Sequence, residues 1–197
     1  MEYRRLGASG LRVSPICLGT MMFGGRTSEK ASIAIISSAR DAGVNFIDTA
    51  NTYVKGESER ITGRAIKRHR HEWVLATKGG NPIGKGPNDR GLGAKNLHKA
   101  IDDSLQRLGT DFVDIYYFHL DDLDTPMEES ITAVTDIIRQ GKARCEARGA
   151  VHTAHASFYK NWVGAAPYYN GAHPSWQVDG LRGDEDVHLT NLDENGK

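Results

Sequence analysis

Short apolar runs of strand length alternate with stretches of helical periodicity between about residues 14 and 141. Each repeating unit opens with one of these runs, at 16–18, 45–48, 74–77 and 112–118. Alternating strands and helices are typical of a parallel sheet covered by helices. The run at 112–118 is almost entirely apolar, which is expected of a strand covered on both faces.

The first three helices are expected near 28–42, from about residue 58, and at 96–108. Gly43 and Gly109 provide the stop signals of the first and third helices. The spacing of apolar residues predicts that the first helix buries Ala31, Ile35, Ala39 and Ala42.

The fourth helix has the clearest start signal in the chain. Thr125 is expected as its N-cap, Pro126 as its first helical residue, and Glu128 as the partner in a capping box. Its predicted buried residues are Ile131, Val134 and Ile138.

Two segments lie outside the repeating pattern. Residues 3–6 and 11–13 flank a glycine-bounded turn, so the opening is predicted to form a hairpin. Residues 142–197 contain no long amphipathic window. We therefore expect a domain at 1–141 and an irregular or disordered tail at 142–197.

Composition excludes some classes of partner. The 25 basic and 25 acidic side chains cancel among 197 residues, which argues against nucleic-acid binding through a charged face. The two cysteines do not form a disulfide framework, and the opening residues do not resemble a leader peptide. No apolar run is long enough to span a bilayer, so we expect a cytoplasmic protein without direct membrane contact.

Four polar residues follow the strand-like runs: Asp48, Tyr53, Lys78 and His119. In a parallel barrel, the carboxyl ends of the strands carry the catalytic groups. Together the four supply a proton donor, two groups that tune it, and an anchor for a carbonyl oxygen. Taken singly, each has a plainer interpretation as a loop tyrosine, a solvated lysine, a turn-forming aspartate or a structural histidine.

Two other motifs are weaker. Residues 79–86 nearly match a phosphate-binding loop, but Gly86 stands where Ser or Thr is needed, and a loop at the barrel mouth fits better. His152 and His155, with Cys145 upstream, lack a second pair of ligands at zinc-finger spacing, so solvated histidines are expected.

The first 140 or so residues resemble the aldo-keto reductases, in particular the branch with potassium-channel beta subunits and related bacterial reductases. The resemblance rests on four segments: YRRLGASGLRVSPICLGTMMFG, NFIDTANTYVKGESE, VLATKGG and DFVDIYYFHLDDLDTPMEES. It implies an α/β fold of the (β/α)₈ TIM-barrel type and NADP(H)-dependent reduction of aldehydes or ketones, with the carbonyl substrate left open.

The resemblance also implies roles for individual residues. Tyr53 would donate a proton, Lys78 would lower the pKa of Tyr53, Asp48 would hold Lys78, and His119 would orient the carbonyl. Cofactor contacts are expected at Gly19, Thr20, Met21 and Asp48.

The sequence departs from the family after Gly141. A complete barrel needs roughly 250 residues, whereas four strand–helix units are recognisable here. A truncated barrel of about four units is therefore expected, with poorly placed catalytic groups and weak or absent turnover. Its open sheet edges and exposed apolar inner face favour aggregation, pairing with a second copy, or partial unfolding. The alternative function is a non-catalytic regulatory or binding subunit.

Overall fold

The computed structural model describes residues 1–7, 9–144, 176–177 and 190–191. The chain divides into two compact units, Met1–Glu146 and Ala147–Lys197. The described part of the second unit is one antiparallel pair, β7 (Trp176–Gln177) with β8 (Thr190–Asn191). Most of the predicted tail, including His152 and His155, lies outside the described residues, so the predicted boundary at 141 stays a prediction.

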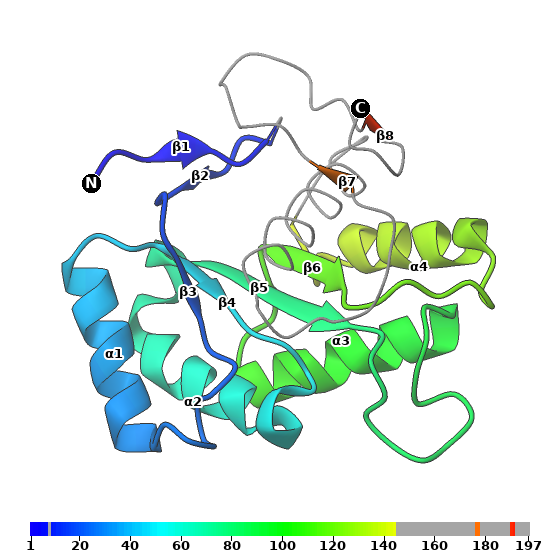
Figure 1. Cartoon of the computed structure of the whole chain (residues 1–197), viewed down its shortest axis with the longest axis horizontal. Helices are drawn as coiled ribbons and strands as arrows, with labels where there is room; N and C mark the ends of the chain where they lie inside the picture. Colours follow the sequence, from blue (N-terminus) through cyan, green and yellow to red (C-terminus); the bar gives the residue numbers. More distant parts are fainter. Residues whose placement is uncertain (8, 145–175, 178–189, 192–197) are drawn as a thin grey trace. The chain divides into compact units, whose positions relative to one another are not determined.

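A four-stranded parallel sheet forms the centre of the first unit (Figure 1). Its strands lie side by side in chain order: β3 (Cys17–Gly19), β4 (Phe46–Asp48), β5 (Val74–Gly79) and β6 (Ile115–Phe118). The predicted strand–helix units are therefore confirmed. The fourth strand begins later than predicted, and Val113 ahead of it forms a single parallel bridge with Ala143.

The four helices pack against one another in sequence order. They are α1 (Glu29–Asp41), α2 (Glu57–Ile66), α3 (Ala94–Leu108) and α4 (Met127–Arg139), with 3₁₀ turns η1 (Tyr53–Gly56) before α2 and η2 (Lys67–Glu72) after it. Two predicted boundaries are confirmed. The Ser28 side chain caps α1 by accepting from the Ala31 N–H, and Gly109 ends α3 in a left-handed conformation.

The predicted buried face of α1 is wrong. Ser32 and Ile36 are the buried residues, whereas Ile35 is 40 % exposed. Ser32 tolerates burial because its hydroxyl donates to the Ser28 carbonyl oxygen at 2.9 Å. A count of apolar residues alone misses a buried serine of this kind.

The predicted start of α4 is also wrong. Pro126 occupies the N-cap position, and no side chain caps the helix. The Thr125 hydroxyl instead donates to Asp122 Oδ2 at 2.7 Å, which occupies the group that a cap would need.

The buried face of α4 is rotated from the predicted one. It consists of Ser130, Ala133, Val134 and Ile137, whereas Ile131 is exposed. The Ser130 hydroxyl donates to the Leu92 carbonyl oxygen, so a polar residue again takes part in the buried face.

The predicted hairpin at the start of the chain is confirmed. Strand β1 (Arg4–Arg5) pairs antiparallel with β2 (Arg12–Val13), in the register Arg4 to Val13.

Alternation along the strands separates the two faces of the sheet. On one face, Thr77 bonds to Glu59 of α2 and the Tyr116 hydroxyl to the Leu97 carbonyl of α3. This is the face that the helices cover. The opposite face carries Asp48 and Lys78, both buried.

Helices α2 and α3 approach closely at Gly63, which is buried. A Cβ atom added there would lie 2.1 Å from the Leu108 carbonyl oxygen. Backbone atoms cannot give way as a flexible side chain can, so this contact requires glycine.

We expect Gly63→Ala to lower the free energy of unfolding by about 1–3 kcal/mol, because the added methyl forces the two helices apart. Urea denaturation measures the change. Gly10→Ala is the matched control, since nothing lies within 4 Å of its added Cβ. Equal midpoints for Gly63→Ala and the parent protein would contradict the packing described.

Candidate active site

The four predicted polar residues come from three neighbouring strand ends. Asp48 is the last residue of β4, and Lys78 lies one residue before the end of β5. Tyr53 opens the η1 turn, and His119 directly follows β6. The His119 N–H donates to the Gly79 carbonyl oxygen at 2.8 Å, which ties the end of β6 to that of β5.

The Lys78 ammonium joins this group together. Its Nζ donates to Asp48 Oδ2 at 2.5 Å, to the Thr49 carbonyl oxygen at 2.9 Å and to the Tyr53 hydroxyl at 3.0 Å. The three partner residues, Asp48, Thr49 and Tyr53, are all buried. These distances hold the three groups together, and the expectation of weak or absent turnover stays a prediction.

His119 lies against the other side of Tyr53. The two rings are 5.7 Å apart between centroids, with planes at 83°, an edge-to-face contact. Such a contact fixes the mutual orientation of two rings. The structure therefore brings all four predicted residues into one cluster.

The Lys78–Asp48 pair is an ion pair removed from water. Burial by itself would lower the pKa of Lys78, but the adjacent Asp48 and Tyr53 oxygens outweigh it and raise the pKa above its usual value. Burial raises the pKa of Asp48, and the Lys78 charge opposes that change. Lys78 is thus held as an ammonium ion. Its hydrogen bonds offset much of the free energy that is lost when the ion is removed from water.

Tyr53 departs from the sequence-based expectation. Burial raises the pKa of its phenol, and this effect outweighs the lowering by the Lys78 charge. The predicted lowering is therefore present as one contribution but is wrong for the net direction. At neutral pH the phenol keeps its proton, which suits a proton donor.

His119 is a neutral imidazole at neutral pH. Burial, helped by the Lys78 charge, lowers its pKa to about 4. A neutral ring carries one N–H donor, which can bond to a carbonyl oxygen without bringing a second positive charge into the site.

The chain turns sharply after Tyr53. Val54 and Lys55 both have positive φ, 48° and 54°, and Gly56 follows with φ 84°. This region is unfavourable for residues with a Cβ, above all for a branched one such as valine. The strained turn sends Tyr53 into the cluster and lets α2 begin at once.

Residues predicted to contact a cofactor differ in what they offer. Gly19 is exposed, lies opposite Asp48 in the sheet and has open space where a Cβ would stand. Met21 is 43 % exposed. Thr20 is fully buried, and its hydroxyl is engaged with Ser58 and the Asp48 carbonyl oxygen. Its side chain is therefore committed to the fold.

Two polar atoms in the cluster are buried without a hydrogen-bond partner among the described residues: Asp48 Oδ1 and His119 Nδ1. Buried polar atoms are normally bonded. These two are therefore available to a molecule that enters the site.

Sequence reasoning missed a cluster of three hydroxyl groups beside the site. Ser58 lies 2.8 Å from the Thr20 hydroxyl and 3.2 Å from that of Thr49, and it donates to the Thr20 carbonyl oxygen at 2.8 Å. All three residues are fully buried. Their positions directly beyond β3 and β4, and in the first turn of α2, were the available signal.

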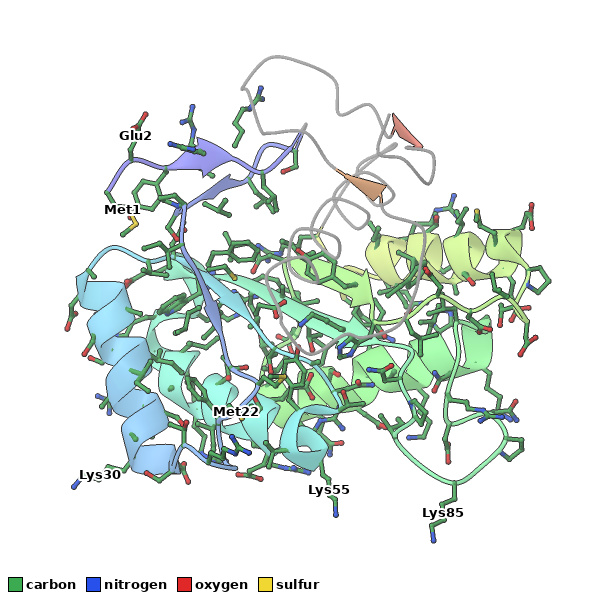
Figure 2. All side chains as sticks on the ribbon, in the orientation of Figure 1. Met1, Glu2, Met22, Lys30, Lys55 and Lys85 are labelled. Carbon is green, nitrogen blue, oxygen red and sulfur yellow. The ribbon has the colours of Figure 1, made fainter. Side chains whose placement is uncertain are left out.

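Residues 79–86 do not form a phosphate-binding site, and Cys145, His152 and His155 lie outside the described residues. Lys85 is exposed at the tip of the loop after β5 and points away from the protein (Figure 2). Helix α3 begins only at Ala94, so a phosphate-binding loop is not formed. Within the described residues, no group of three or more His, Cys, Asp or Glu side chains could hold a metal ion. None of the described helices is long and apolar enough to cross a membrane.

The pKa of His119 predicts a pH dependence of stability. The folded value, about 4, lies below the ordinary value of 6.5. The unfolded chain therefore binds more protons between these values, so stability is complete above about pH 6.5 and falls as the pH drops toward 4. The loss is at most about 3.5 kcal/mol, because the pKa differs by about 2.5 units and each unit corresponds to about 1.4 kcal/mol.

Urea denaturation across this pH range, compared with His119→Gln, isolates the contribution because the other titrating groups are shared. The parent protein should lose more stability than the variant. Parallel curves would show that His119 is not a buried neutral imidazole.

Comparison with known proteins places this geometry in a family. The profile of the Aldo/keto reductase family matches residues 15–170. A probable voltage-gated potassium channel subunit beta from Oryza sativa subsp. japonica is 41% identical over 150 residues, which are 73% of this chain and 44% of that protein. The uncharacterized oxidoreductase YrpG of Bacillus subtilis (strain 168) is 42% identical over 153 residues, 72% of this chain and 47% of that protein.

A solved structure agrees. The holo form of aldo-keto reductase AKR11C1 from Bacillus halodurans superposes with a TM-score of 0.67 at 35% identity, covering 73% of this chain and 48% of that one. The chain thus spans less than half the length of these relatives. The predicted α/β TIM-barrel type of fold is confirmed, and the chain belongs to the aldo/keto reductase family.

Proposed function

We propose that this chain is an oxidoreductase that reduces aldehydes or ketones to alcohols with NADP(H). The observation that carries the proposal is the buried Lys78 ammonium, bonded to both Asp48 and the Tyr53 hydroxyl. This arrangement places a protonated phenol beside a fixed positive charge, as proton donation to a carbonyl oxygen requires.

The proposed reduction adds two hydrogens in different forms. The carbonyl carbon would accept a hydride, which is the chemistry that a reduced nicotinamide would supply when bound. Tyr53 gives its proton to the carbonyl oxygen, so one C–H and one O–H bond form as the C=O π bond breaks. The phenolate left on Tyr53 is stabilised by the Lys78 ammonium 3.0 Å away, until a proton from solvent restores it.

His119 orients the carbonyl in this proposal. Its neutral ring lies edge-to-face with Tyr53, so an N–H donor and the phenol can approach the same oxygen. Two donors at one oxygen favour the state in which negative charge develops there.

The residues of the site fit a nicotinamide cofactor in three respects. Asp48 Oδ1 is a buried acceptor without a partner among the described residues, suited to a ribose hydroxyl. Gly19 lies beside it with no side chain to fill the space. Met21 adds an exposed apolar side chain from the loop after β3. The choice of NADP(H) rests on the family resemblance.

The first test is NADPH binding to the purified chain, followed by cofactor fluorescence and by thermal stability. Saturable binding should stabilise the folded state. A screen of aldehydes and ketones then follows the loss of NADPH absorbance. We expect Tyr53→Phe to retain NADPH binding and to reduce turnover by a factor of about 10² or more.

Tyr3→Phe is the matched control, because Tyr3 is an exposed tyrosine whose hydroxyl bonds only to the Gly43 carbonyl among the described partners. Its turnover should equal that of the parent chain. Absence of NADPH binding would refute the cofactor, and equal turnover of Tyr53→Phe and the parent would refute the proton donor.

A regulatory or binding subunit is the second candidate function. It is favoured by the names of two relatives, the Oryza sativa protein and an Arabidopsis thaliana probable voltage-gated potassium channel subunit beta that is 40% identical over 149 residues. A second copy, paired through the β3 or β6 edge of the sheet, is the simplest partner to test by sedimentation. Assembly without turnover would favour this candidate over the enzyme.

A further inference from the structure

Glu59, in the first turn of α2, has an entirely buried carboxylate outside the four-residue cluster. Its Oε1 accepts from the Thr77 hydroxyl at 2.6 Å, and its Oε2 accepts from Arg107 Nε at 2.5 Å. Burying a carboxylate is costly, and an apolar side chain of similar size often serves packing as well or better. Packing alone therefore does not explain a charged group at this position.

The hydrogen bond from Thr77 links Glu59 to the active-site cluster, because Thr77 belongs to β5, the strand that also carries Lys78. Thr77 directly precedes Lys78, and successive side chains of a strand point to opposite faces. A hydroxyl held firmly on the helix-covered face fixes the rotation of β5 about its own axis. The rotation of β5 in turn sets the direction in which the Lys78 side chain extends from the opposite face of the sheet.

The neighbouring residue of α2 holds the other strand ends. Ser58 bonds to Thr20 beyond β3 and to Thr49 beyond β4, and the Thr49 carbonyl oxygen accepts from Lys78. One helical turn thus contacts the carboxyl ends of three strands. Arg107 anchors Glu59 from α3, so its bond to Thr77 is held by two helices.

We propose that Glu59 is a positioning residue for Lys78 and acts through the Thr77 hydroxyl. The inference rests on the proposed roles of Lys78 and Tyr53. The Glu59–Thr77 bond holds β5 in the orientation that brings the ammonium between Asp48 and Tyr53. Glu59 does not touch the reacting groups, so its effect passes through the geometry of Lys78.

The test uses the ¹⁵Nζ chemical shift of Lys78 in the labelled chain, assigned with Lys78→Met. This shift reports the hydrogen-bond geometry of the folded ammonium and needs no cofactor or substrate. Thr77→Val removes the hydroxyl while keeping the shape, and it should move the Lys78 signal. Thr77→Ser keeps the hydroxyl and should leave the signal at its original position.

Thr62→Val is the matched control. Thr62 is a fully buried threonine on α2, and its hydroxyl has no partner among the described residues, so the Lys78 signal should not move.

An unmoved Lys78 signal in folded Thr77→Val overturns the inference, as does an equal movement in Thr62→Val. If Thr77→Val does not fold, Thr77→Ala removes the hydroxyl without placing a methyl group against the Glu59 carboxylate, and it is held to the same criterion. A shifted signal in Thr77→Ser would also overturn the inference, because that variant retains the bond.

The outcome is separable from that of the proposed function. A moved signal in a chain without reductase activity supports the positioning role and refutes only the enzyme. In an active chain, Thr77→Val should lower kcat by roughly tenfold with KM little changed, because a misplaced group weakens the transition state more than substrate binding.

Discussion

Hydrogen bonds from the Lys78 ammonium to three described residues are the constraint on which the rest of the site depends. A buried cation needs nearby oxygen atoms, and these come from the end of β4 and from the turn that follows it. The ends of β4 and β5 must therefore keep their register, and Tyr53 must turn back toward them. The strained backbone at Val54 and Lys55 is what this return requires.

The same burial that strengthens the ion pair makes Tyr53 a weaker acid. Removing water raises the pKa of the phenol, while the fixed ammonium lowers it, and the first effect is larger. A phenol that stays protonated at neutral pH is ready to donate, whereas the reverse reaction would need the phenolate. For the proposed reductase, the Lys78 ammonium thus opposes the effect of burial that would make proton donation harder.

The sequence was most informative where chemistry and topology coincide. Asp48, Lys78 and His119 could be placed from the ends of apolar runs, because parallel strands deliver their carboxyl ends to one edge. Helix faces were harder, since Ser32 and Ser130 are buried through bonds to backbone carbonyls that apolar periodicity does not register. The N-cap at Thr125 failed for a related reason, because its hydroxyl has a competing partner in Asp122.

Glu59 could not have been found from periodicity at all. On a helix, a glutamate next to a serine is usually a solvated residue, and only the three-dimensional contact with Thr77 and Arg107 shows that this one is buried. Its partners lie 18 and 48 residues away in the chain. Long-range bonds of this kind are decided by the packing of α2 between β5 and α3, which no local pattern encodes.

The compactness of the site explains how a chain that spans less than half the length of its relatives can hold it. The four groups come from β4, β5, β6 and the turn after β4, which are consecutive in the chain and adjacent in the sheet. Their mutual distances are set by strand pairing and by the first turn of α2, all within residues 46–119. Cofactor binding is a separate requirement, because it depends on how much protein surface surrounds the carboxyl ends of the strands. The geometry of proton donation and the affinity for a nucleotide are therefore independent properties, and this chain can possess the first without the second.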